Sequence, residues 1–408
     1  MLQRFINSAR INVFESRHFY YWVLLFMLAH LVLRRCVIKL TTIYGLSETI
    51  FVDVSTFFVY GLTSLLCLLS ILITNAPGSK LFFFTWFSVL LISIINTFRF
   101  EILFQDDVFG EMFKGQLYAD FRVLFPLLFF TVLHKLRKGF SLNHKVFFFV
   151  KKIVLINSIL VILGVIFNIS LFESYSFESG RWGYSGIFSR SYIVVMSSVY
   201  LIHSLQTTGK NKYFEILLFT IALVCSGTKA GLLSVILIFM IVVVKGIKNQ
   251  LIVTSLLGAF LLIFLKWGSL VIRYSNFWKN VYDSHGIWGI LTGLRNNTFN
   301  AFYELLMNDY TVWDWLFGGL AFSRGVWVEM VFFDLFAFYG IIGFVIFIRF
   351  FIKWIPSWTA SIPLLVAFVS GQLIINPFAF IIWGIWIEME KNANRSLNRK
   401  GVTLLNTI

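Results

Sequence analysis

Two carboxylates lie in the otherwise apolar and aromatic stretch VWVEMVFFDLFAFYGIIGFVIFI, residues 326–348, and they are Glu329 and Asp334. A charged group at the centre of a bilayer-crossing helix costs roughly 2.5–3.5 kcal/mol on insertion scales. A carboxylate can act as general base toward a hydroxyl, or it can be the partner of a nearby cation. In one continuous helix the two side chains would be about 140° and about 7 Å apart, so they would not share a face. This spacing favours the ion-pair role.

Arginine recurs in two glycine-containing segments. Arg181 lies between Gly180 and Gly183 in SGRWGYSGIFSRS, Arg190 comes just before the next apolar run, and Arg295 lies in TGLRNN. A planar guanidinium suits bidentate recognition of phosphate, and neighbouring glycines permit close approach of a backbone. The alternative is that these arginines reach toward lipid headgroups and do nothing else.

A third basic element interrupts the apolar run 213–245, which is too long for one membrane span. Ser226, Gly227 and Thr228 predict a tight turn between two helices, where small residues let the backbones approach. Lys229 follows this turn and either faces an anion or reaches to the headgroups. The Gly-x-x-x-x-Gly-Lys spacing of a phosphate-binding loop is missing.

The elements that must position these residues are membrane helices. The 408 residues are 59% hydrophobic and 13% charged, whereas soluble proteins are about 25% charged. The net charge of +15 is explained by basic cytoplasmic loops and does not require nucleic acid. Three scattered cysteines and six histidines without ligand spacing predict neither disulfides nor a metal site. We therefore expect an all-α polytopic membrane protein with no cleavable signal peptide, metal, cofactor or nucleic-acid partner.

Apolar runs long enough to cross a ~30 Å hydrocarbon core predict about 12 transmembrane helices. They are expected at 19–34, 54–74, 80–98, 117–134, 146–168, 188–206, 213–226, 227–245, 250–267, 326–348, 357–375 and 376–389. Basic connections at 134–145, 208–212, 245–250 and 390–400 are expected in the cytoplasm together with both termini. Gly340 and Gly343 are expected to let another helix pack closely.

We expect one integral membrane domain over residues 1–408 with two larger outer loops. Its sections are N-terminal helices 1–168, a loop 169–187, helices 188–267, a large loop 268–325, helices 326–389 and a cytoplasmic tail 390–408. Loops this long in a compact protein are more often functional than idle.

Four segments, in order, resemble the O-antigen polymerase and ligase superfamily, bacterial membrane glycosyltransferases that act on undecaprenyl-diphosphate-linked sugars. These segments are SGRWGYSGIFSRS, SGTKAGLL, TGLRNN followed by LFGG, and VEMVFFDLFAFYGIIG. The resemblance covers about residues 170–385, and the N-terminal third is similar only in being hydrophobic. It implies a GT-C-like fold in the bacterial inner membrane, with the outer loops and the active site facing the periplasm.

The resemblance implies that Arg181 and Arg295 grip the lipid diphosphate. Arg190, Lys229 and Arg324, which closes the large loop, are expected to bind substrate with them. The resemblance also implies that donor and acceptor are both undecaprenyl-diphosphate-linked glycans and that undecaprenyl diphosphate leaves as the chain is transferred. Preorganised cations would stabilise the charge on this leaving group. Membrane lipid and a regulator of chain length are the other expected partners.

One position distinguishes polymerases from ligases, and it precedes a Gly-x-x-Gly pattern. Gly340 and Gly343 match that pattern here, and counting back from them identifies the position. Ligases have histidine where this chain has Glu329, so the resemblance favours a polymerase of the Wzy type over a ligase. Polymerases often have a second acidic residue two places after this position, but this chain has Val331 there. The general base therefore remains open between Glu329 and Asp334, and the latter is also a candidate for substrate binding.

The leading alternative outside enzymes is a flippase for lipid-linked oligosaccharide. The chain has no internal repeat of the kind common in transporters, and its charges gather in the outer loops. A purely structural membrane subunit would not need the two arginine-bearing loops. Four aromatic residues of these loops, Trp182, Tyr184, Trp313 and Trp315, are candidates for stacking on sugars or for anchoring in the interface.

Overall fold

The computed structural model describes most of the chain. The described residues are 17–44, 58–69, 79–103, 108–133, 140–175, 182–207, 211–246, 279–286, 295–324, 326, 328–370, 373 and 376–399. Within these ranges the chain is helical apart from short connections. The exceptions are one 3-10 turn, Ser170–Phe172, and a single bridge between Glu173 and Tyr184, and no strand occurs in the described part. The predicted all-α class is confirmed.

The described helices include one at or near each predicted span that the structure describes, and three more within the stretch 268–325 that was predicted as a loop. They are α2 Arg17–Tyr44, Phe58–Leu69, α4 Lys80–Leu103, α5 Val108–Leu133, α6 Phe140–Phe167, α7 Arg190–Gln206, α8 Lys212–Cys225, α9 Lys229–Gly246, α12 Arg295–Asn308, α13 Val312–Phe317, α14 Leu320–Ser323, α15 Val331–Trp354, α16 Trp358–Ser370 and α17 Pro377–Arg399. The predicted span 250–267 lies outside the described residues.

Among the residues that the structure describes, three helical segments are long and apolar enough to cross a membrane, namely Lys80–Arg99, His144–Phe167 and Val331–Trp354. Shorter apolar helices are Phe58–Leu69, Lys229–Ile241 and Trp358–Phe368. A helix rises 1.5 Å per residue, so the 14 residues of α8 reach only about 21 Å, less than a hydrocarbon core. The structure thus indicates a helical membrane protein, while twelve spans and a GT-C-like arrangement stay predictions.

The chain forms two compact units, each assembled from distant parts of the sequence. Unit 1 comprises Met1–Val150, Glu304–Ile355 and Gly371–Met389, and unit 2 comprises Lys151–Tyr303, Pro356–Ser370 and Glu390–Ile408.

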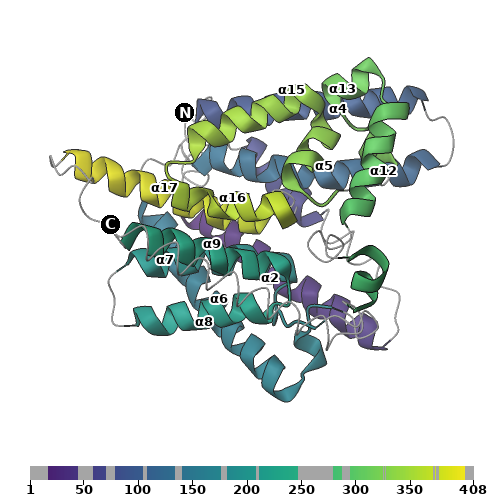
Figure 1. The fold of residues 1–408 in the computed structure, drawn as a ribbon. Coiled ribbons are helices and arrows are strands. Elements are labelled where there is room, and N and C mark those ends of the chain that lie inside the picture. The colour runs from purple at the N-terminus through teal and green to yellow at the C-terminus, as the bar shows by residue number, and fades with distance from the viewer. Residues whose placement is uncertain are drawn as a thin grey trace. The chain divides into compact units, whose positions relative to one another are not determined.

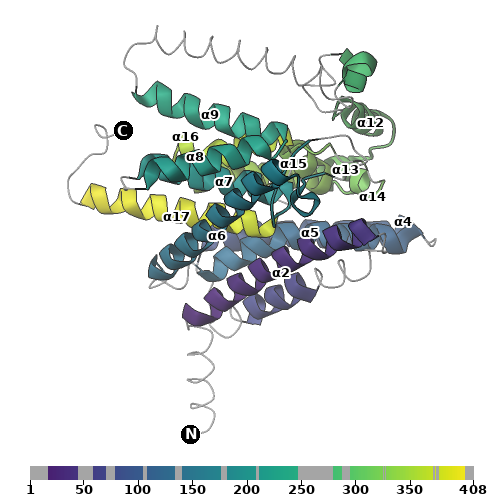
Figure 2. The ribbon, with the colours of Figure 1, turned by 90° about the horizontal axis from the view of Figure 1, so that it is seen from below.

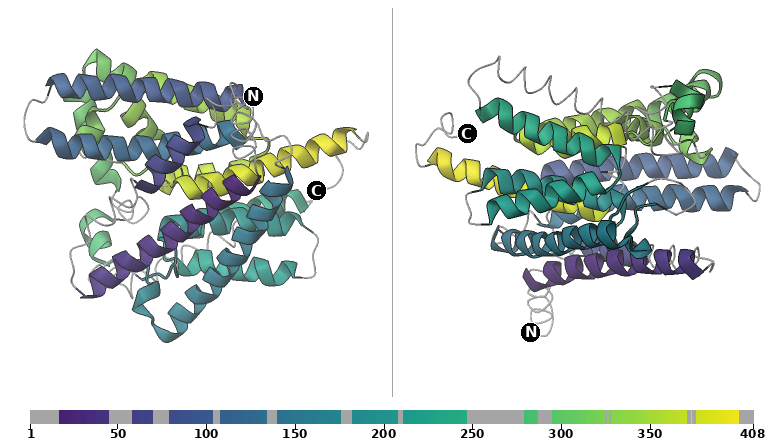
Figure 3. Two further views of the ribbon diagram at one scale, coloured as in Figure 1. Left: turned by 180° about the vertical axis from the view of Figure 1, so that it is seen from behind. Right: turned by 60° about the horizontal axis from the view of Figure 1, so that its bottom comes forward.

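In unit 1, α4 packs against both α5 and α15 (Figure 1; Figure 3, left, from behind). α4 and α15 are antiparallel, because Asn96 contacts Phe338 near one end and Phe82 contacts Trp354 near the other. Aromatic rings fill the core, and the Phe82 and Phe350 centroids are 5.1 Å apart. The antiparallel pairing places the end of α4 beside the beginning of α15.

In unit 2, α7 packs against both α8 and α9, and α16 packs against α9 (Figure 2). α7 is buried along most of its length and forms the centre of the unit. Its Tyr200 ring stacks on Phe219 of α8, with centroids 5.9 Å apart. The loop that precedes α7 is therefore held by a rigid helix.

The prediction of one continuous helix over 326–348 is wrong in two respects. The helix begins at Val331, and it is interrupted at Gly340, whose φ is 61° and ψ is −167°. Glycine has no Cβ and adopts this conformation without steric cost. The helical-wheel argument that separated Glu329 from Asp334 therefore does not apply, because Glu329 lies outside the helix.

Candidate functional site

The first two motif segments lie against each other in unit 2. The backbone N–H of Tyr184 donates to the carbonyl of Cys225 over 2.7 Å, and the Ser174 hydroxyl donates to the carbonyl of Ser226 over 3.0 Å. The last carbonyls of a helix have no partner within it. At the end of α8 they accept from the loop before α7. The predicted break between α8 and α9 is confirmed, and its function in the fold is to receive this loop.

Glycines make this contact possible. Gly227 has φ 67°, and a Cβ built on it would lie 2.6 Å from Gly183 Cα and closer still to the Trp182 carbonyl oxygen. Real Cβ atoms essentially never come within 3.0 Å of a heavy atom in a residue that is not their neighbour in the chain. In the described structure these glycines serve an approach of two backbones, and their predicted contact with phosphate stays a prediction.

Asn157 of α6 holds the following residues of the loop. Its side-chain amide donates to the Ser185 carbonyl over 3.0 Å, and its Oδ1 accepts the Ile187 N–H over 2.8 Å. The side chain is fully buried. Sequence reasoning missed Asn157, although an amide in the middle of an apolar span was a usable signal.

Three of the predicted cations in unit 2 share one feature, which is that each begins a helix. Arg190 is the first residue of α7, Lys229 of α9 and Arg295 of α12, and all three are half-buried. The Arg190 guanidinium lies over the ring of Tyr175, 4.8 Å from its centroid. The amino end of a helix carries a partial positive charge, so a cation there is unfavourable by roughly 0.3–1 kcal/mol. A bound anion would offset that cost. Arg181 lies outside the described residues.

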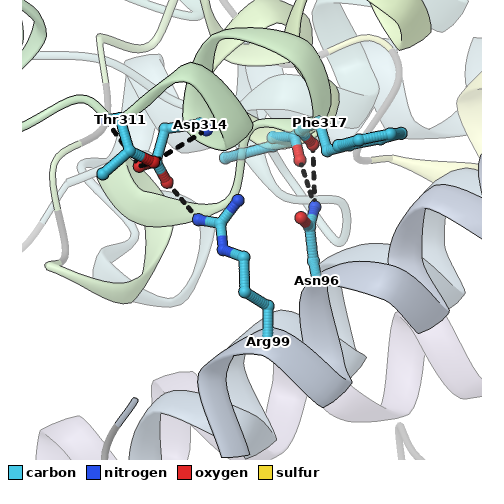
Figure 4. A network of polar contacts seen from close by, with 6 residues as sticks. Asn96, Arg99, Thr311, Asp314 and Phe317 are labelled. Carbon is cyan, nitrogen blue, oxygen red and sulfur yellow. Dashed lines mark hydrogen bonds and ion pairs between the residues drawn. The ribbon is translucent and has the colours of Figure 1, made fainter. Parts of the chain in front are cut away.

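In unit 1, an ion pair fixes the short helix α13 to α4 (Figure 4). Arg99, near the end of α4, pairs with the buried carboxylate of Asp314. The same carboxylate accepts the backbone N–H of Thr311 over 2.9 Å, and the Thr311 hydroxyl caps α13 in return. This reciprocal capping box satisfies the free N–H groups that begin a helix. Sequence reasoning assigned no role to Arg99 or Asp314.

Asn96, one turn before Arg99, bridges α13 and α15. Its Nδ2 donates to the Phe317 carbonyl over 2.8 Å and to the Phe338 carbonyl over 3.2 Å (Figure 4 shows its approach to Phe317). The N–H of Gly319 donates to the Ala337 carbonyl over 2.8 Å. The LFGG part of the third motif segment thereby lies against the fourth.

The close contact expected at the glycines of α15 is present at Gly340. A Cβ on Gly318 would lie 2.5 Å from the Gly340 nitrogen, and one on Gly340 would lie 2.5 Å from the Phe317 nitrogen. The neighbour is the end of the short helix α13. A Cβ built on Gly343 would instead lie 2.2 Å from Tyr339 Cβ and 3.4 Å from Ile92 Cδ1 of α4.

The two carboxylates of the opening stretch have different surroundings. Glu329 is exposed and has φ 57°, which is unusual for a residue with a Cβ. Asp334 is buried, and its Oδ1 accepts the N–H of Val328 over 3.1 Å. Asp334 thus folds back over the backbone that presents Glu329. Contact between Asp334 and substrate stays a prediction.

Arg324 forms an ion pair with Asp309, and both side chains are exposed.

Among the four aromatic candidates for sugar stacking, Trp182 and Trp313 are more than half exposed and Trp315 is 38% exposed. The prediction for Tyr184 is wrong, because its ring is buried and its hydroxyl donates to the Asn168 side chain.

Burial raises the pKa of Tyr310, and the neighbouring Asp314 raises it further, although Arg99 acts in the opposite direction. Burial and then Glu173 raise the pKa of Tyr184. Both phenols therefore stay neutral over the physiological pH range.

The described residues contain no group of three or more His, Cys, Asp or Glu side chains placed to hold a metal ion.

Comparison of the whole chain with protein-family models, with curated proteins and with solved structures gives no match in any of the three. The functional assignment therefore depends on the motif residues and their geometry.

Proposed function

We propose that this protein polymerises undecaprenyl-diphosphate-linked oligosaccharide repeat units into a surface polysaccharide such as O-antigen. It acts as a metal-independent glycosyltransferase of the Wzy type at the periplasmic face of the bacterial inner membrane. One observation carries the proposal, which is that the motif segments pair off in space. The first contacts the second in unit 2 through Gly183 and Gly227, and the LFGG part of the third contacts the fourth in unit 1 through Gly319 and Ala337.

The cations in unit 2 suit the diphosphate of the lipid carrier. Arg190, Lys229 and Arg295 each place a positive charge at the positive end of a helix, where an anion is most strongly attracted. As the anomeric C–O bond breaks, its electron pair leaves with undecaprenyl diphosphate. Arg181 and Arg295 stabilise the charge that develops on this leaving group.

Glu329 is the better candidate for general base. Its side chain is exposed, so a sugar hydroxyl can reach it. It accepts the proton of the acceptor hydroxyl while the hydroxyl oxygen forms the new glycosidic bond. Asp334 is buried and occupied by the Val328 N–H, so we assign it to the support of the Glu329 backbone.

The experiment is a cell-envelope glycan ladder. The gene is deleted in its own host and complemented with wild type, Arg295→Ala or Glu329→Gln, and two control variants are carried in parallel. Glu304→Gln changes an exposed glutamate of α12, and Arg349→Ala removes an exposed arginine in the second half of α15. We expect the deletion strain to show core plus a single repeat unit. Wild type and both controls should restore the ladder, and the two test variants should not.

Other ladders contradict the proposal in distinct ways. Bare core with polymer held on the lipid carrier would mean a ligase, and bare core with single repeats trapped on the inner side would mean a flippase. A normal ladder from Arg295→Ala would remove that residue from the diphosphate site. A normal ladder from Glu329→Gln would remove Glu329 as the base.

A further inference from the structure

The interruption of α15 at Gly340 leaves backbone carbonyls without their helical partners. In a helix each carbonyl accepts the N–H four residues later. The non-helical φ and ψ of Gly340 turn the following N–H groups away from Ala337 and Phe338. Carbonyls without a partner are costly in a membrane interior, because no water replaces the lost hydrogen bond. Other groups must therefore satisfy them.

The two freed carbonyls are satisfied from outside the helix. Gly319 donates its N–H to Ala337 over 2.8 Å, and Asn96 donates to Phe338 over 3.2 Å. The same Asn96 nitrogen also donates to Phe317, the last residue of α13, over 2.8 Å. One side chain of α4 thus joins the end of α13 to the break in α15.

The two N–H donors of the Asn96 side chain are the part of it that forms hydrogen bonds. The residue is fully buried, and its Oδ1 has no hydrogen-bond partner among the described residues. An unsatisfied buried acceptor is unfavourable, so an apolar side chain would be preferred here if Asn96 only filled space. The two carbonyls to which the amide donates explain why an amide fits this position.

The part of α15 that Asn96 and Gly319 hold is also the part that fixes the backbone next to Glu329. The first part of α15, Val331–Tyr339, carries Asp334, whose carboxylate holds the Val328 N–H. Glu329 follows Val328 and has φ 57°, a conformation that persists only where the surroundings impose it. A loosened first part of α15 would therefore release Glu329 from its conformation.

We propose that Asn96 is a positioning residue for the transfer reaction, acting through the first part of α15 to hold the Glu329 carboxylate in place. The inference rests on the proposed function, because it assigns the proton-accepting role to Glu329.

The test compares Asn96→Leu with Ser93→Ala in the purified full-length protein. Ser93 is also a buried polar residue of α4, but its hydroxyl donates within its own helix, to Val89 over 3.0 Å. Amide hydrogen exchange is followed along the chain, and kcat and KM are measured with lipid-linked repeat units. Asn96→Ser retains one donor and serves as a second variant in case the leucine variant does not fold.

For Asn96→Leu we expect faster exchange selectively over residues 328–340, with α7 and α8 unchanged. We expect kcat to fall about 10- to 100-fold, since a displacement of about 1 Å has an effect of this size. KM for the acceptor should stay within about two-fold, because the substitution affects the position of the base in the chemical step and not the binding of the acceptor. Asn96→Ser should give the same selective pattern at smaller amplitude, and Ser93→Ala should behave as wild type.

Uniformly faster exchange, or no change over 328–340, would overturn the inference, since Asn96 would then contribute only general stability. Selective exchange with an unchanged kcat would overturn the positioning role while leaving the proposed function intact. A wild-type protein that polymerises nothing would remove the proposed function, and the inference with it.

Discussion

Substitution of Gly227 by alanine tests the contact on which the functional proposal depends most. The backbone at Gly227 has φ 67°, which costs an L-residue roughly 1–2 kcal/mol. A Cβ there would also lie 2.6 Å from Gly183 Cα, well below the ordinary contact distance of 3.4–4 Å. Overpacking of this kind adds about 1–3 kcal/mol. We expect a total loss of roughly 2–5 kcal/mol in the free energy of unfolding.

Gly286→Ala is the matched control. Gly286 has nearly the same conformation, with φ 63°, but nothing lies within 4 Å of a Cβ built on it. Its alanine variant therefore meets only the conformational cost of roughly 1–2 kcal/mol. The difference between the two variants, about 1–3 kcal/mol, isolates the close approach of the two motif segments.

The assay is denaturant unfolding of the purified protein in detergent, followed by tryptophan fluorescence, together with the glycan ladder in cells. Gly227→Ala should be clearly less stable than Gly286→Ala and should lose the ladder, whereas Gly286→Ala should retain it. Equal stability of the two variants would refute the reasoning, because residues 182–183 would then not lie against the turn at Gly227.

Two further predictions concern single polar contacts. Tyr184→Phe should lower the free energy of unfolding by about 0.5–1.5 kcal/mol at pH 8. Because burial and Glu173 raise the pKa of Tyr184 in the folded state, its contribution is fully present below the unfolded pKa of about 10 and is lost as pH rises above it. The stability difference from wild type should therefore narrow in unfolding curves above about pH 10, and a widening gap would contradict the assignment. Lys151→Met removes the cation that lies 2.7 Å from Glu215 in a largely buried pair and leaves that carboxylate, among the described residues, only the Ser204 hydroxyl, so about 3 kcal/mol should be lost. Arg324→Ala breaks an exposed pair and should cost about 0–1 kcal/mol in the same unfolding assay; equal losses from both variants would show that burial does not set the strength of these pairs.

The helical class and the position of most helices followed from the sequence because they depend on local pattern. Apolar runs near the length of a membrane span predicted helices that the structure places at the same residues, including α4, α6 and α7. Small residues at 226–228 predicted the break between α8 and α9. Such features are encoded within a few turns of chain, since a helix satisfies its own backbone.

The break in α15 and the supports of the candidate site were not predictable in this way. The residues on both sides of Gly340, from 335 to 348, are apolar or aromatic throughout, and glycine at 340 is compatible with either a packed helix or a broken one. What decides between them is the approach of Asn96 from α4 and of Gly319 just after α13, which donate hydrogen bonds to the Phe338 and Ala337 carbonyls at the break. Partners so distant in sequence are brought together only by packing.

The sequence by itself determined that this is an all-helical chain with membrane-spanning character, and where acidic and basic residues interrupt its apolar runs. Only the tertiary structure decided that Asp334 folds back onto the Val328 backbone while Glu329 stays exposed. The physical reason is that local pattern sets which residues are helical, whereas the partner of a buried polar group depends on which distant segment packs against it.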